Sequence, residues 1–132
     1  MAKTTIKQWS DKTTKKMETL VRKVALDAFS EVILKTPVDS GRARGSWGVG
    51  VGTVNAGPHD NPDKSGDATI AAAASAVAGM QVGKVITLAS NLPYIERLEY
   101  GYSKQAPGGM VRLTEQRWSP IVDKAVAQIA RT

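Results

Sequence analysis

The residues of this sequence that could do hydrolytic chemistry are few and lie far apart. The chain has one histidine, His59, and no cysteine. A nucleophilic serine such as Ser40 or Ser46 would therefore have to use His59 as its base. This histidine lies in an Asn-, Asp-, Gly- and Pro-rich segment, residues 55–66, which is predicted to be a mobile loop. A mobile loop is a poor place for a preorganised base, so the spacing argues against a Ser-His-Asp hydrolase.

The same loop holds the residues that would have to bind a metal ion. Asp60, Asp63 and Asp67 lie near His59, but loops that bind hard cations carry their ligands at tighter spacing. Without cysteine, neither a thiolate zinc site nor a disulfide can form. We therefore predict no metal site and interpret the segment as a solvated loop.

Two glutamates offer the remaining arrangement for acid–base chemistry. Glu96 and Glu99 are one helical step apart, which could place two carboxylates side by side. Arg97 lies between them, which favours a solvated or interface-facing edge. The Gly-Val-Gly-Val-Gly stretch at residues 48–52 lacks the Gly-Lys-Ser/Thr ending of a phosphate-binding loop and precedes a loop, not a helix. Neither pattern therefore favours a catalytic site.

Aromatic and basic side chains gather in two segments of the chain. Such side chains stack on bases and contact phosphates, so a small basic nucleic-acid-binding protein is one interpretation, although no named nucleic-acid-binding motif occurs. Two of the aromatic residues also fit structural roles, which we favour: Trp47 as a core residue of a strand, and Tyr94 packed against a long helix. The two groups are Arg42, Arg44 and Trp47 in the first segment, and Tyr100, Tyr102 and Lys104 in the second.

The formal net charge of +6 is unevenly distributed. Residues 1–47 hold ten Lys/Arg against five Asp/Glu, whereas the remainder holds eight against seven. This excess predicts an acidic partner or nucleic acid near the N-terminal third, or a basic face that keeps the protein in solution. No run of 18 apolar residues and no hydrophobic signal core at the N-terminus occur, so we expect a soluble protein made in a cytoplasm.

A long helix is predicted over residues 11–35, because its apolar residues recur at steps of three and four. Ser10 is expected to cap its start, and Pro37 to end it by restricting Thr36. A final helix is predicted over residues 111–130, with Pro120 causing a kink or a division into two helices.

The middle of the chain is predicted to alternate between strands and short helices. Strands are expected at residues 46–54 and 84–90, and short helices at 67–79, capped by Asp67, and at 93–101. Glycines on one face of the first strand permit close approach by a helix of the same chain or by a neighbouring subunit. Residues 38–44 are the best candidate for a further strand.

These elements predict an α+β fold in a single domain over residues 1–132. Its long N-terminal helix and its C-terminal helix are expected to pack on a small, mainly antiparallel sheet.

Two sequence blocks resemble those of the bacteriophage tail-completion family, the neck and minor tail proteins of long-tailed phages. TPVDSGRARGSW, residues 36–47, is similar to that family's Thr-Pro-Val-Asp-Thr-Gly-Arg-Leu-Arg-Gly-Ser-Trp segment. ITLASNLPYIERLEYGYSKQAPGGMVRLT, residues 86–114, is similar to its second block, an Asn-Asn-x-Pro-Tyr stretch leading to Leu-Glu-Tyr-Gly and Ser-Lys-Gln-Ala-Pro. Conservative departures are Ser40 for Thr, Ala43 for Leu and Ser90 for the first Asn.

The resemblance implies a virion structural protein of the tail and neck, made in the cytoplasm of a host bacterium and built into a six-fold ring. It implies the fold of tail-terminator-like proteins, no enzymatic activity and no cofactor. The implied partners are sister copies, a head-closure or connector protein, and the tail terminator or tail tube protein. Non-specific contact with DNA passing through the neck is also implied, and no membrane is involved.

Tyrosine, tryptophan and arginine are enriched in protein interfaces because they combine large contact area with a polar group. The segment at residues 90–111 is therefore interpreted as an assembly surface. We expect Glu96, Arg97 and Glu99 of one subunit to meet basic groups such as Arg42 and Arg44 of the next. The predicted interface residues are Arg42, Arg44, Trp47, Glu96, Arg97, Glu99, Tyr100, Tyr102, Lys104 and Gln105.

Overall fold

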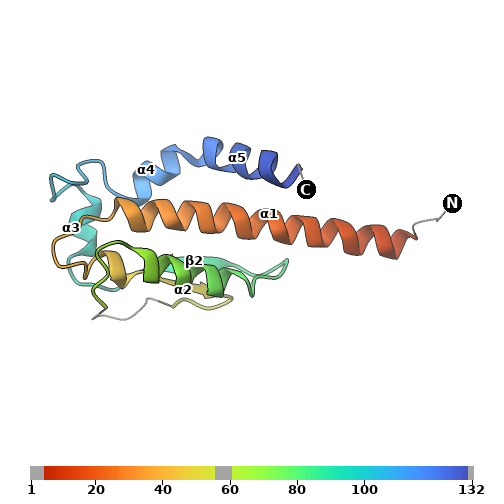
Figure 1. The fold of residues 1–132 in the computed structure, drawn as a ribbon, viewed down its shortest axis with the longest axis horizontal. Helices are drawn as coiled ribbons and strands as arrows, with labels where there is room; N and C mark the ends of the chain where they lie inside the picture. The colour runs from red at the N-terminus through yellow and green to blue at the C-terminus, as the bar shows by residue number, and fades with distance from the viewer. Residues whose placement is uncertain (1–4, 56–60, 131–132) are drawn as a thin grey trace.

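A long helix, α1 (Ile6–Lys35), runs through the molecule and projects beyond it at its N-terminal end (Figure 1). This computed structural model describes residues 5–55 and 61–130. The helix begins earlier than the predicted Ser10 cap. A capping box sets the start: the Thr5 hydroxyl accepts from the backbone N–H of Gln8 at 3.1 Å, while the Gln8 side chain accepts from the backbone N–H of Thr5 at 3.0 Å. The predicted end before Pro37 is confirmed.

The sheet has two short antiparallel strands, β1 (Gly48–Val51) and β2 (Ile86–Ala89), paired from Gly48 with Ala89 to Val51 with Ile86. Both strands lie inside the predicted ranges. The further strand expected at residues 38–44 does not form, and the chain turns there into a 3-10 turn, η1 (Arg44–Ser46). At Gly50 a β-carbon would collide with the carbonyl oxygen of Thr53, so the close approach is made by this chain's own loop after β1.

Helix α2 (Asp67–Val77) covers the sheet and one side of α1. Ile33 of α1, Val49 of β1 and Ala73 and Val77 of α2 form one buried cluster. Asp67 is the first helical residue and not the predicted N-cap. The Asp63 carboxylate caps the helix instead, as described below.

The C-terminal part of the chain forms α3 (Ile95–Glu99), α4 (Val111–Gln116) and α5 (Trp118–Ala130). The predicted division of the last helix is confirmed, with the break at Arg117. Pro120 therefore lies in the first turn of α5, where its missing N–H has no helical partner to lose.

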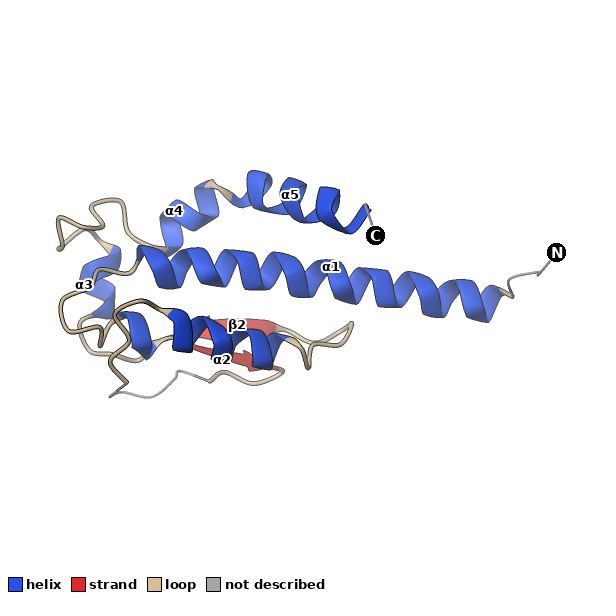
Figure 2. Ribbon diagram, in the orientation of Figure 1, coloured by secondary structure: helices blue, strands red, loops and turns tan. Residues whose placement is uncertain are grey.

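The predicted α+β class is confirmed (Figure 2). α5 packs on α1, across that helix from α2 and the sheet, through a buried cluster of Val24, Ala28, Ile121 and Ala125 (Figure 1). α1 is thus the central layer on which the other elements are placed. Of the helices in the described ranges, none combines the length and the apolar character needed to cross a bilayer.

The end of the molecule opposite the projecting helix holds a third buried cluster. Val32 and Ala43 meet residues from the α3 region there, and the whole set is Val32, Ala43, Leu92, Leu98, Ala106 and Met110. Both sequence blocks that carry the family resemblance contribute to this cluster. Packing here therefore positions the residues predicted to form an interface.

Candidate functional site

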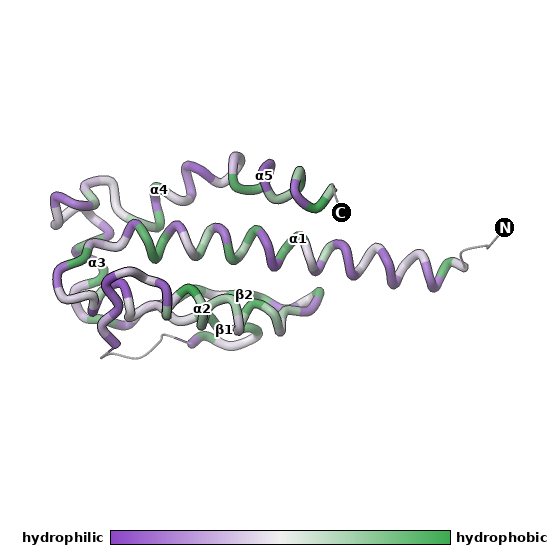
Figure 3. Tube along the Cα trace, in the orientation of Figure 1, coloured by the Kyte–Doolittle hydropathy of each residue, from purple (hydrophilic) through white to green (hydrophobic). Residues whose placement is uncertain are grey.

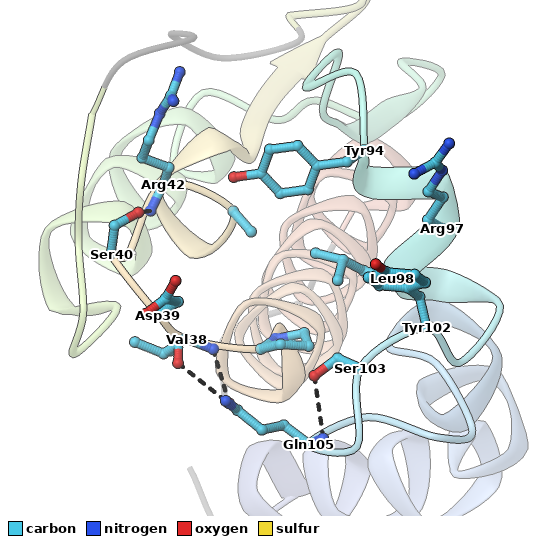
Figure 4. A pocket seen from close by; sticks show the side chains of 13 residues that line it. Val38, Asp39, Ser40, Arg42, Tyr94, Arg97, Leu98, Tyr102, Ser103 and Gln105 are labelled. Atoms are coloured by element: carbon cyan, nitrogen blue, oxygen red, sulfur yellow. Dashed lines mark hydrogen bonds between the residues drawn. The ribbon is translucent and has the colours of Figure 1, made fainter.

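A cleft opens where residues 37–43 meet residues 94–105 (Figure 4). Its volume is 370 Å³, and its lining includes Arg42, Tyr94, Arg97, Tyr102 and Gln105. The first segment leaves the C-terminal end of α1, whereas the second runs from the start of α3 into the loop that follows it. The cleft therefore combines, in one concave surface, residues predicted from both sequence blocks.

Gln105 ties the two sides of this cleft together. The backbone N–H of Val38 donates to Gln105 Oε1 at 2.9 Å, and Gln105 Nε2 donates to the Val38 carbonyl oxygen at 3.1 Å. These bonds satisfy both backbone groups of Val38 in a segment that belongs to no helix or strand. Gln105 is thus a positioning residue of the cleft, and its backbone loop is held by the Ser103 hydroxyl, which accepts from Gln105 N at 3.2 Å.

The turn at Gly41 packs against the segment that precedes α2. Gly41 has a φ of +88°, and a β-carbon there would lie 2.7 Å from the backbone nitrogen of Asp63. The Gly41 carbonyl accepts from Asp63 N at 3.0 Å and from Gly45 N at 2.9 Å. The first wall of the cleft is therefore anchored to a neighbouring loop.

Asp63 is a buried carboxylate that fixes this loop. It accepts from Gly66 N at 3.0 Å, from Thr69 N at 2.8 Å and from the Thr69 hydroxyl at 2.7 Å. Burial by itself raises the pKa of Asp63, but the hydrogen bonds from Thr69 and Gly66 outweigh it and bring the pKa below its ordinary value. Part of the predicted mobile loop, residues 61–66, is thus fixed to the start of α2 by the hydrogen bonds of Asp63. Residues 56–60, with His59 and Asp60, lie outside the described residues.

Arg44 is directed into the molecule. Its guanidinium donates to the carbonyl oxygens of Leu34 at 2.7 Å, Thr36 at 3.1 Å and Lys64 at 2.7 Å. The first two are carbonyls at the C-terminal end of α1, where a cation is favourable. Arg44 therefore joins the end of α1 to the loop before α2.

Trp47 packs against the core as predicted, although it lies directly before β1 and not on a strand. Its indole Nε1–H donates at 2.8 Å to the hydroxyl of Thr36, which is fully buried and donates in turn to the Val32 carbonyl at 2.7 Å. The ring packs against two of the buried clusters. Tyr94 differs from its expected packing on the long helix: it lines the cleft and is 39% exposed.

Glu99 is occupied by its own chain. Its carboxylate accepts from the backbone N–H groups of Met110 at 3.0 Å, Val111 at 2.7 Å and Arg112 at 3.1 Å, and from Arg112 Nε at 3.0 Å. These are orphan donors at the start of α4. Burial by itself raises the pKa of Glu99. The N–H donors, led by Val111, lower it by more than burial raises it, so the pKa lies below its ordinary value.

The expected charge pairing between subunits has to be reconsidered in this light. Glu99 already pairs with Arg112, and Arg44 already binds backbone carbonyls. Glu96, Arg97 and Arg42 remain exposed. A pairing between subunits that uses Glu96 and Arg97 stays a prediction, whereas one through Glu99 or Arg44 would compete with bonds that hold the fold.

The tyrosines form the exposed part of this end of the molecule. Tyr100 and Tyr102 are 69% and 76% exposed. The guanidinium carbon of Arg112 lies 5.0 Å from the centre of the Tyr100 ring, which restricts that ring on one face. Lys104 is exposed on the same loop. The cleft and these residues together, hereafter the tyrosine end, provide large amphipathic contact area.

The candidate chemical groups do not converge in the described residues. The Ser46 hydroxyl is buried and hydrogen-bonded to the Ala43 carbonyl at 2.6 Å and to the Ser90 hydroxyl at 2.7 Å. Ser40 Oγ accepts from Arg42 N. Across residues 5–55 and 61–130, no cluster of three His, Asp or Glu side chains could hold a metal ion.

Sequence reasoning missed Asp63 and Arg112 as residues that shape this end. Arg112 binds Glu99, 13 residues earlier in the chain, so no local pattern marked it. Asp63 binds Gly66 and Thr69 nearby in the sequence, a local capping pattern that the prediction of Asp67 as N-cap overlooks. A scan against protein-family models, a search of curated proteins and a search of solved structures each found no match to the chain.

Proposed function

We propose that the chain is a structural protein of the bacteriophage neck, which forms a ring that joins the tail tube to the head-closure or portal complex. The observation that carries this proposal is the tyrosine end. There the two segments resembling the tail-completion family fold against each other and leave Tyr100 and Tyr102 exposed. A tail-terminator-like fold and a place in the virion neck belong to the same proposal.

The side chains of the tyrosine end support a role in binding a partner and not in covalent chemistry. Its hydrogen-bonding side chains hold backbone: Gln105 binds Val38, and Glu99 binds the start of α4. The exposed remainder is aromatic and charged, the composition that contributes most to binding energy in protein interfaces. A cleft whose two sides are already joined by internal hydrogen bonds loses less conformational entropy when a partner binds.

The sister subunit and the ring below or above it are the proposed partners of this end. Contacts within a ring are heterologous, so the tyrosine end of one copy would meet a different surface of the next. Glu96 and Arg97 are exposed on α3, and Arg97 also lines the cleft, so a partner of complementary charge can be recognised there.

The test is complementation of head–tail joining. A phage lacking the gene for this chain is expected to accumulate filled heads and finished tails that stay separate. Adding the purified chain to that extract should restore infectious particles, and electron microscopy should locate the chain at the neck. Joined, infectious particles formed without the chain, or its location elsewhere, would overturn the proposal.

DNA binding is the second candidate function, and the projecting part of α1 favours it. Lys7, Lys12, Lys15 and Lys16 are exposed there and form no ion pair with a described residue. If these lysines neutralise phosphates, binding should weaken with salt at a slope of roughly 0.9 per phosphate contact in a log–log plot. Replacing Lys12, Lys15 and Lys16 by Gln should reduce that slope by about two to three units. If the chain is a neck protein that does not bind DNA, the variant with all three lysines replaced should join heads and tails as efficiently as the native chain.

A further inference from the structure

An apolar trough runs along α1 on a face that the chain leaves open. Its floor is α1 over residues 20–32, and its walls are Ile86 and Leu88 of β2 on one side and Trp118 and Val122 of α5 on the other. Two adjoining hollows of 420 and 330 Å³ make up the trough and share Ala28, Phe29 and Trp118. Trp118 is 50% exposed, so this wall of the trough is not covered by any other part of the described chain.

The projecting part of α1 carries an apolar stripe with no cover. Ile6, Trp9 and Met17 are 86%, 63% and 52% exposed. Together with Thr13 they follow one another at steps of three and four residues, which places them on one side of a helix at about 100° per residue. The same side continues into Val24, which α5 buries. The stripe is therefore an extension of the α1–α5 contact beyond the reach of α5.

The stripe and the trough have matching lengths. The stripe with its continuation, residues 6–20, spans about 21 Å, and the trough floor, residues 20–32, spans about 18 Å at 1.5 Å per residue. Both lie on α1 and meet near residue 20. A second α1 laid antiparallel across that point would place its stripe in this trough, while its own trough received this stripe.

Charges at the two ends of the trough favour this direction. Lys84 lines the end near Leu20, and Glu115 lines the end near Val32. In an antiparallel partner, the N-terminal end of α1, with Lys7 and the positive end of the helix dipole, would lie near Glu115. The partner's Glu18, which also pairs with Arg22 of its own helix at 3.2 Å, would lie toward Lys84. A parallel partner would reverse both pairings.

We propose that the free chain is a two-fold symmetric dimer in which two α1 helices pack antiparallel, each filling the other's trough. An isologous contact of this kind closes at two copies and leaves neither a stripe nor a trough bare. A head-to-tail arrangement would leave one of each at its ends. The dimer concerns the chain before assembly and does not depend on the neck function, because it is measured on the purified chain alone.

The first test is the mass of the free chain by light scattering over a dilution series. The native chain is expected to have the mass of a dimer at micromolar concentration. Met17→Glu should raise the dissociation constant tenfold or more, because it places a carboxylate in the apolar contact. Val54→Glu is the matched control: Val54 is 68% exposed and lies outside the trough and the stripe, so this variant should stay dimeric. Circular dichroism checks that both variants are folded.

The second test determines the direction of packing by cysteine cross-linking. Because the native chain has no cysteine, only the introduced residue can react. Val21 lies near the proposed two-fold axis, so Val21→Cys should be linked to its own copy by a short bismaleimide. Val54→Cys should not, and neither should Thr13→Cys, because antiparallel packing holds its two copies roughly 21 Å apart along the helix axis, whereas parallel packing would bring them side by side. A monomer or an assembly larger than a dimer, a dimer unaffected by Met17→Glu, or a Val21→Cys chain that fails to cross-link would each overturn the proposal. None of these outcomes bears on the complementation of head–tail joining.

Discussion

The side-chain amide of Gln105 and the backbone of Val38 form a two-bond clasp, with N–O distances of 2.9 and 3.1 Å. The two residues are 67 positions apart. The clasp joins the segment that follows α1 to the loop that follows α3, and it thereby sets the width of the cleft at the tyrosine end. A partner that binds the cleft meets a surface whose shape depends on this one side chain.

Gln105→Ala is expected to lower the free energy of unfolding by about 1 kcal/mol, because two backbone groups of Val38 must turn to water. Hydrogen exchange at the Val38 amide should accelerate, which urea unfolding alone would not reveal. Gln81→Ala is the control, since Gln81 is exposed and its side chain forms no hydrogen bond with a described residue. Unchanged exchange at Val38 would show that the clasp does not hold the cleft.

Glu99→Ala should destabilise the protein by about 1–3 kcal/mol, because the N–H groups at the start of α4 lose their acceptor and Arg112 loses its partner. The exposed Glu96 lies on the same helix and provides the control, for which a change within about 0.5 kcal/mol is expected. Urea denaturation measures both. Equal effects at the two positions would contradict the capping role of Glu99.

Tyr102→Ala is expected to reduce head–tail joining in the complementation assay while leaving the unfolding midpoint unchanged. The side chain is 76% exposed, so the fold does not depend on it, whereas a buried tyrosine at an interface contributes about 2 kcal/mol or more to binding. Tyr102→Phe retains most of the contact area and should join with near-native efficiency. If Tyr102→Ala joins normally, the contact lies elsewhere.

Trp47→Phe should have the opposite profile from Tyr102→Ala. Loss of the indole donor to Thr36 is expected to lower the free energy of unfolding by about 1 kcal/mol, with joining retained at temperatures where the variant is folded. Tyr102→Phe, at an exposed position outside the proposed α1 contact, is the control, and its free energy of unfolding should not change. Reduced joining without reduced stability would show that Trp47 contacts a partner.

The order of helices and strands could be predicted because it depends on local patterns. Apolar steps of three and four marked α1, and Pro37 marked its end. The start of α1 was misplaced, although the pattern Thr5-x-x-Gln8 is a readable capping box. The prediction places the cap at Ser10, close to the apolar stripe, and so excludes Ile6 from the helix.

The roles of the charged residues could not be predicted in the same way. Glu99 and Arg44 are directed inward by partners that only folding brings near: the start of α4 and the end of α1. In sequence they resemble the exposed Glu96 and Arg42. A carboxylate at the start of a helix and a guanidinium at its end satisfy backbone groups, and this use competes with the use in an interface. Residue types and their spacing therefore located the tyrosine end. They could not distinguish the charged residues that hold its fold from those that stay exposed.

Acidification should destabilise the protein through Asp63 and Glu99. Hydrogen bonds bring the pKa of each folded carboxylate below its ordinary value despite burial. At a pH below the ordinary values of about 4, the unfolded chain therefore binds more protons than the folded chain, and the free energy of unfolding falls as the pH falls. The stabilisation is fully present above those values and is lost as the pH drops through the folded-state pKa values.

Urea unfolding between pH 6 and pH 2.5 measures this dependence. Asp63→Asn and Glu99→Gln should each be less stable than the native chain at pH 6 and should each show a shallower loss on acidification, because one coupled proton is removed. Asp39→Asn is the matched control at an exposed carboxylate of the cleft, and its slope should equal that of the native chain. A native slope retained in both Asp63→Asn and Glu99→Gln would place the acid sensitivity elsewhere, for instance at Glu31, whose pKa is lowered by Arg117 and Lys35 against the opposing effect of burial.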